Sequence, residues 1–85
     1  MANHKSAIKR ARQSEEQRVR NRSRKTRMKN AVRDLDGVIS KSPENAAAEL
    51  KKAVSVISRT ASEGVIHKNT ASRKISRLTR RVNAL

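Results

Sequence analysis

The sequence predicts an all-α protein: an antiparallel, up-down-up bundle of three helices whose long, basic N-terminal helix extends beyond the bundle. Three segments place apolar residues at helical spacing, and none shows the alternation of a strand. Only two short breaks separate these segments. A chain of 85 residues makes one small domain. We therefore expect residues 1–85 to form a single unit, with 1–27 as a basic arm and 28–85 as the bundle.

The first segment is predicted to be a helix from about residue 7 to 40. Its apolar face is confined to the C-terminal part, at Met28, Val32, Leu35 and Ile39. Upstream, residues 12–27 contain one larger apolar residue, Val19, and carry charge on every side. A helix there has no packing partner and repels itself, so we expect it to fray in isolation and to become ordered on a polyanion.

The second helix is expected from about residue 43 to 63. Ser42 is the predicted N-cap, Pro43 the first helical residue, and Gly64 the left-handed residue that ends the helix. The apolar face consists of Ala46, Leu50, Ala53, Ile57 and Ala61.

The third helix is expected from about residue 69 to 85, capped by Asn69 or a neighbour. In the connection before it, Val65 and Ile66 are expected to cover the end of the apolar core. The apolar face of this helix consists of Ala71, Ile75, Leu78, Val82 and Leu85.

The charge of the chain points to a polyanionic partner. There are 22 basic and 7 acidic residues, for a formal net charge of +15, and twelve of the basic residues lie in the first 33 positions. Such a density of positive charge is typical of nucleic-acid binding. Because Phe, Tyr and Trp are absent, bases cannot stack on aromatic rings. We therefore expect recognition of folded nucleic acid through phosphates, 2′-hydroxyls and groove shape.

Catalytic and metal-binding patterns are missing from the sequence. There is no cysteine, and His4 and His67 are far apart, with no acidic residue at ligand spacing. His67 is expected to contact phosphate or to cap the third helix. Asp34 and Asp36 point in different directions on a helix and are expected to balance cations such as Arg33. We expect no enzymatic activity, no metal, no cofactor, no small-molecule substrate and no membrane span.

The candidate contacts lie on the arm and on the third helix, where Arg73, Arg77, Arg80 and Arg81 form a basic stripe. The middle helix is close to neutral and is expected to face away from the nucleic acid. A DNA-compacting nucleoid protein is the alternative that composition leaves open. A membrane-active peptide would need an apolar face that residues 12–27 lack.

Several stretches resemble the bacterial small-subunit ribosomal protein family numbered twenty. They are residues 2–10 (ANHKSAIKR), 12–15 (RQSE), 20–21 (RN), 23–25 (SRK), 64–69 (GVIHKN) and 76–78 (SRL). The resemblance implies a three-helix structural constituent of the 30S subunit, located in the cytoplasm. It implies direct binding to 16S rRNA, in the 5′ domain and at the long penultimate helix, during assembly. It also implies few protein contacts and no homo-oligomer.

The resemblance also assigns RNA contacts residue by residue. Carried onto this chain, they are Lys5, Ser6, Lys9, Arg10, Arg12, Gln13, Ser14, Arg20, Asn21, Lys25, His67, Lys68, Asn69, Arg73, Lys74 and Arg77. The charge pattern adds Arg18, Arg22, Arg24, Arg27, Lys29, Arg80 and Arg81. Two positions depart from the family pattern: Glu16 and Ile75 stand where basic residues are common. Ile75 therefore belongs either to the third apolar face or to its rim.

Overall fold

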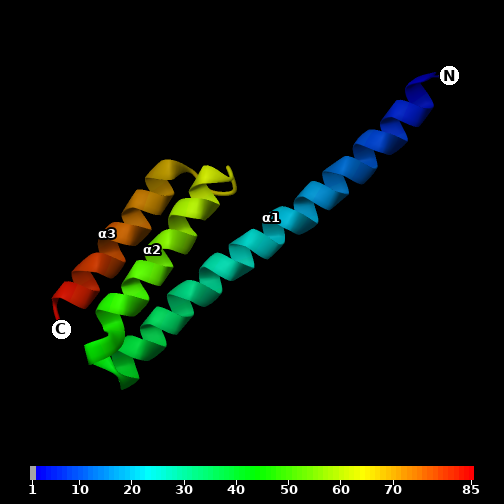
Figure 1. Ribbon diagram of the computed structural model, residues 1–85. Helices are drawn as coiled ribbons and strands as arrows, with labels where there is room; N and C mark the ends of the chain where they lie inside the picture. Colours follow the sequence, from blue (N-terminus) through cyan, green and yellow to red (C-terminus); the bar gives the residue numbers. More distant parts are fainter. Residues whose placement is uncertain (1) are drawn as a thin grey trace.

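Three helices run up, down and up, as the sequence predicts. The computed structural model describes the backbone of residues 2–85 and the side chains from residue 5 onward, so the side chain of His4 lies outside the described residues. Helix α1 spans Ala2–Lys41, a 3-10 turn η1 spans Pro43–Asn45, α2 spans Ala46–Ser62 and α3 spans Lys68–Asn83. Helices α2 and α3 lie along the C-terminal half of α1, whose N-terminal half projects alone (Figure 1).

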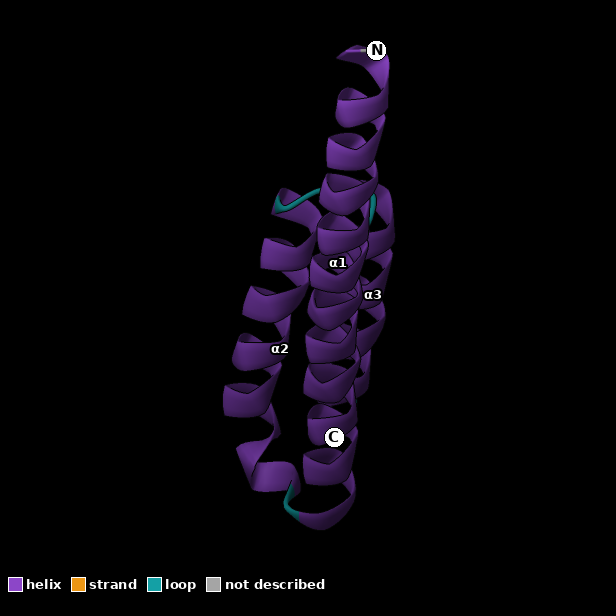
Figure 2. Cartoon of the chain, turned by 90° about the vertical axis from the view of Figure 1, so that its right-hand side faces the viewer, coloured by secondary structure: helices purple, strands orange, loops and turns teal. Residues whose placement is uncertain are grey.

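Helix α1 determines the length of the molecule. Its 40 residues correspond to about 60 Å at 1.5 Å per residue, and the chain measures 63 × 23 × 13 Å. It begins earlier than the predicted residue 7, because neither Gly nor Pro interrupts the sequence before Gly37. Viewed from the side, α1 continues well past the ends of the other two helices (Figure 2).

The core is a narrow seam to which all three helices contribute. Leu35 of α1 and Ile57 of α2 are both 0% exposed. Around them lie Met28, Ala53, Ala71 and Leu78, with partly buried Val32, Ile39, Leu50, Val56, Ala61, Ile66, Ile75 and Val82. The buried hydroxyl of Thr60 donates to the carbonyl of Val56 at 2.8 Å, so it is not left unpaired. The three predicted apolar faces therefore meet in one core.

The edges of the core differ from the prediction at Leu85 and Val56, and they decide between the two places expected for Ile75. Leu85 was expected in the third apolar face and is 59% exposed, because α3 ends at Asn83. Ile75 is half-buried and packs against the core, which places it at the rim. Val56 packs against the core as well, although the predicted α2 face did not include it.

The two connections are built as the sequence suggests, with one difference. Ser42 is the N-cap and Pro43 the first residue of η1, as predicted, but the Ser42 side chain makes no capping hydrogen bond. Gly64 has φ +77° and ends α2: its N–H donates to Ala61, and the N–H of Val65 donates to Thr60. This pair of bonds is a Schellman motif, in which glycine takes the left-handed conformation without steric cost.

Candidate nucleic-acid interface

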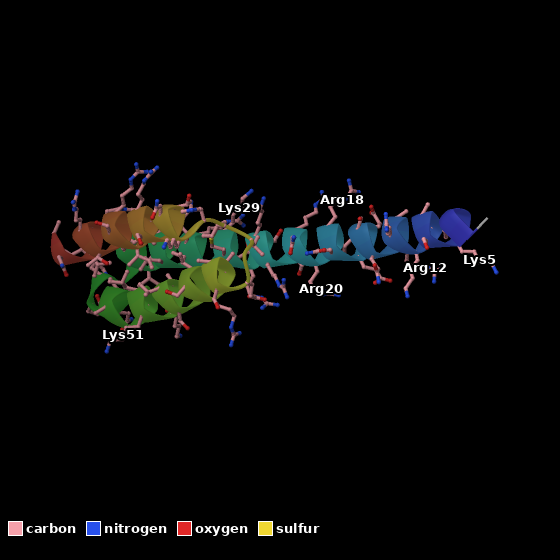
Figure 3. All side chains as sticks on the ribbon, turned by 90° about the horizontal axis from the view of Figure 1, so that it is seen from above. Lys5, Arg12, Arg18, Arg20, Lys29 and Lys51 are labelled. Carbon is pink, nitrogen blue, oxygen red and sulfur yellow. The ribbon has the colours of Figure 1, made fainter. Side chains whose placement is uncertain are left out.

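The arm of α1 exposes its cations around the whole helix. Every side chain from residue 5 to residue 20 is exposed. Seen from above, Arg18 points to one side of the helix, whereas Lys5, Arg12 and Arg20 point to the other (Figure 3). Because the charges face opposite directions, the arm can contact phosphates on two sides at once.

Acidic residues offset little of this charge. Arg18 pairs with Glu15 at 3.1 Å, and the two side chains are 76% and 60% exposed. An exposed pair of this kind contributes little to stability and is readily exchanged for another anion. The polar candidates Ser6, Gln13 and Ser14 are exposed on the same segment.

At the base of the arm, α1 is joined to the end of α2. Nε of Arg24 lies 2.6 Å from Oε2 of Glu63, and both side chains are 27% exposed. Nη1 of Arg24 donates to Oδ1 of Asn21 at 3.5 Å. Residues 21–27, assigned to the arm from sequence, therefore lie beside the bundle, and the segment that projects freely is residues 2–20.

Three of the four stripe residues on α3 share one face. Arg73, Arg77 and Arg80 are exposed and line a shallow recess of about 310 Å³ with two serines, Ser72 and Ser76. Their spacing brings three guanidinium groups onto adjacent turns of one side of the helix. This face can meet a phosphate backbone over about two helical turns.

Arg81 does not line that recess and pairs with α1 instead. Its Nη1 lies 2.5 Å from Oδ1 of Asp36, with the side chains 50% and 45% exposed. The expected partner of Asp36 was a neighbour such as Arg33, so that interpretation is wrong: the carboxylate links α1 to α3. Arg81 thus has a role in holding the helices together.

The turn before α3 brings a further polar cluster close to the base of the arm. Nδ1 of His67 accepts from the backbone N–H of Asn69 at 3.0 Å, so His67 is the N-cap of α3, one of its two predicted roles. Lys68 and Asn69 are exposed beside it. Because Glu63 contacts Arg24, this turn lies alongside the middle of α1 (Figure 1).

Comparison with known proteins identifies the family. The family model described as "Ribosomal protein S20" matches residues 2–83. The chain belongs to this family. "Small ribosomal subunit protein bS20" of Syntrophobacter fumaroxidans is 70% identical, with the whole of both chains covered. The protein of the same name from Desulfotalea psychrophila is 62% identical over the whole of this chain and 97% of the relative. The predicted membership is thereby confirmed.

The RNA contacts predicted from the family resemblance and from the charge pattern are accessible in the structure. All of them are exposed except Asn21, Arg24 and Lys74, which are half-buried. No helix among residues 2–85 is long and apolar enough to cross a membrane. Nor do three His, Asp or Glu side chains gather as metal ligands in the part of the chain that the structure describes.

Two residues of α2 near this interface were missed. Ser55 and Arg59 are exposed and, with Arg24 and Arg27, line a recess between α1 and α2. The middle helix was expected to face away from the nucleic acid. The available signal was the position of Arg59 next to the core-facing Thr60, which places it at the edge of the α2 face that packs on α1.

A larger groove between α1 and α2 contains charges of both signs. It measures about 740 Å³ and is lined by Arg22, Arg27 and Lys52 but also by Asp34 and Glu49. Since the two signs of charge are interspersed along it, it offers no consistent attraction for an anion.

Proposed function

We propose that this S20-family chain is a structural constituent of the small ribosomal subunit that binds 16S rRNA directly. The contacts lie in the 5′ domain and at the long penultimate helix, as the family resemblance implies. The protein stabilises the packing of RNA helices during assembly. The observation that carries the proposal is the arrangement of two basic surfaces on one helical frame. They are the arm, now taken as the projecting residues 2–20, and the α3 face, formed by Arg73, Arg77 and Arg80.

The arm acts as a basic rod between RNA segments. Cations such as Arg12 and Arg18 leave the helix on opposite sides (Figure 3), so the rod can neutralise two phosphate backbones that would otherwise repel each other. A helix is long and narrow enough to lie where RNA helices converge. The exposed hydroxyl and amide groups of Ser6, Gln13 and Ser14 supply donors for phosphates and 2′-hydroxyls.

The α3 face supplies the selectivity for one folded RNA. Arg73, Arg77 and Arg80 stand at a fixed separation from the arm, because the core and the Asp36–Arg81 pair join α1 to α3. An RNA that presents phosphates to both surfaces gains both sets of contacts, whereas a simple duplex gains one. Shape therefore takes the place of base reading in a protein without aromatic residues.

The ribosome in the cytoplasm is the proposed location of the protein. We expect no enzymatic activity, no cofactor, few protein contacts and no homo-oligomer. Most of the exposed surface of the arm is assigned to RNA in this proposal.

The test compares three ligands at one salt concentration: the folded 5′ domain of 16S rRNA, an RNA duplex and a DNA duplex. Substitution of Arg73→Ala with Arg77→Ala should weaken binding to the folded domain far more than binding to the RNA duplex. The control, Lys41→Ala with Lys51→Ala, removes equal charge from exposed positions and should affect both ligands little. Deletion of residues 1–20 should weaken binding to every ligand.

The dependence of the affinity on salt concentration is a second test of the same interface. If on the order of 6–10 cations meet phosphates, the affinity should fall about 10³–10⁵-fold between 50 and 200 mM salt. A nearly flat profile would remove phosphate neutralisation as the source of affinity. Equal binding of the wild-type protein to all three ligands would contradict the ribosomal role and favour a DNA-compacting nucleoid protein.

A further inference from the structure

A small recess lies between α1 and α2, outside the two basic surfaces described above. Arg24 and Arg27 of α1 line it from one side, and Ser55 and Arg59 of α2 from the other, with Val56 and Thr60 behind them. Its volume is about 100 Å³, well below the roughly 300 Å³ at which pockets for small organic molecules begin. A group of the size of a phosphate suits it, and a nucleoside does not.

The charges around the recess have one dominant sign. Three arginines from two helices line it, and the carboxylate of Glu63 pairs with one of them, Arg24. Among the described residues, Arg27 and Arg59 take part in no ion pair. Like charges gathered at one place repel one another, so an anion bound between them is favoured.

One of these arginines is already oriented. Nε of Arg24 contacts Glu63 at 2.6 Å, and Nη1 contacts Asn21, so its guanidinium plane is fixed before any ligand arrives. A donor fixed in this way loses less conformational entropy when it binds an anion. The hydroxyl of Thr60 is engaged with the carbonyl of Val56, which leaves Ser55 as the hydroxyl donor of the recess.

We propose that this recess binds one backbone phosphate of the RNA, with Arg27, Arg59 and Ser55 as donors and Arg24 completing the cradle. Helix α2, which was expected to face away from the nucleic acid, thereby becomes part of the RNA interface. The inference rests on the proposed function and adds a third contact point to those on the arm and on the α3 face. Arg is suited to the site because its planar fork binds phosphate through two parallel hydrogen bonds.

The test uses the full-length protein, the folded 5′ domain RNA and the substitution Arg59→Gln. The affinity should fall on the order of tenfold, and the slope of log affinity against log salt should decrease by about one. Lys51→Gln removes the same charge from an exposed position two turns away on α2 and should leave the slope unchanged. Arg59→Lys should restore the slope but recover only part of the affinity, because the fork is lost.

The possible outcomes distinguish a failure of the recess proposal from a failure of the proposed ribosomal role. If wild-type protein prefers the folded domain but Arg59→Gln behaves like Lys51→Gln, the recess does not bind RNA, and the ribosomal role stands. If wild-type protein shows no preference for the folded domain, the ribosomal role itself fails. Inorganic phosphate, added at constant ionic strength, tests the other source of the anion. A shift of the Arg59 guanidinium NMR signal, with unchanged RNA affinity in Arg59→Gln, would assign the recess to free phosphate and overturn the inference.

Discussion

The ion pair between Arg24 and Glu63 should couple the base of the arm to the bundle by about 1 kcal/mol. The perturbation is a double-mutant cycle in which Arg24→Gln and Glu63→Gln are made singly and together. A cycle is needed because each single change also alters the net charge of a strongly basic chain. That effect appears on both sides of the cycle and cancels from the coupling energy.

The magnitude follows from distance and exposure. Exposed ion pairs contribute about 0.2–1 kcal/mol, and hydrogen bonds to charged groups contribute about 1.5–3 kcal/mol. The Arg24–Glu63 pair, at 2.6 Å with both side chains 27% exposed, lies between these classes. The Arg18–Glu15 pair is 76% and 60% exposed, so its coupling belongs at the bottom of the first range. Asp36 and Arg81, at 45% and 50% exposure, should rank between the two.

Urea unfolding followed by far-ultraviolet circular dichroism measures these energies. A chain of 85 residues at roughly 0.05–0.15 kcal/mol per residue has a free energy of unfolding of about 4–13 kcal/mol, so a coupling of this size is resolvable. Added salt should reduce the Glu15–Arg18 coupling more than the Arg24–Glu63 coupling, because water and ions screen the exposed pair. A coupling below about 0.3 kcal/mol for Arg24–Glu63, within the usual error of additivity, would refute the reasoning from burial.

Three further outcomes test the core, a helix cap and the arm. Leu35→Ala should lower the free energy of unfolding by about 2–5 kcal/mol, while Leu85→Ala, at an exposed position, should change it by less than about 0.5 kcal/mol; similar losses would contradict the assigned core. His67→Ala should cost about 1 kcal/mol through the lost N-cap, and an unchanged urea midpoint would argue against the cap. In hydrogen exchange on the free protein, amides of residues 5–20 should exchange faster than those of residues 28–39 and become protected on RNA. Equal protection without RNA would show that the arm needs no partner.

The bundle could be predicted from the sequence because its packing follows from local spacing. Met28, Val32, Leu35 and Ile39 follow one another at steps of four, three and four residues. The other two helices repeat this spacing, which leaves each helix one face to bury. Leu85 continues the apolar spacing of α3 but is exposed to solvent, because α3 ends before it. Periodicity shows which side of a helix is apolar. Whether a residue on that side packs against another helix depends also on where the helix ends.

The contacts between helices could not be predicted in the same way. Asp36 and Arg81 are 45 residues apart, and no local pattern selects one arginine among so many as the partner of one aspartate. Arg59 was overlooked for a related reason. The charges of the predicted middle helix, residues 43–63, sum to zero, but the phase of Arg59 on α2 places it beside Arg24 and Arg27. Position around the helix axis, rather than total charge, determines which surface a residue joins.

The placement of the acidic residues separates the cations that hold the helices together from those that we propose to bind RNA. There are only 7 acidic residues against 22 basic ones, and two of the acidic residues, Asp36 and Glu63, link α1 to α3 and to α2. Arg81 is thereby committed to the bundle, and Arg24 is oriented at the base of the arm. An acidic residue on the α3 face would instead neutralise an arginine that we propose to contact phosphate. Because Asp36 and Glu63 lie where helices meet, they reduce repulsion within the bundle and leave the charge of Arg73, Arg77 and Arg80 available to RNA.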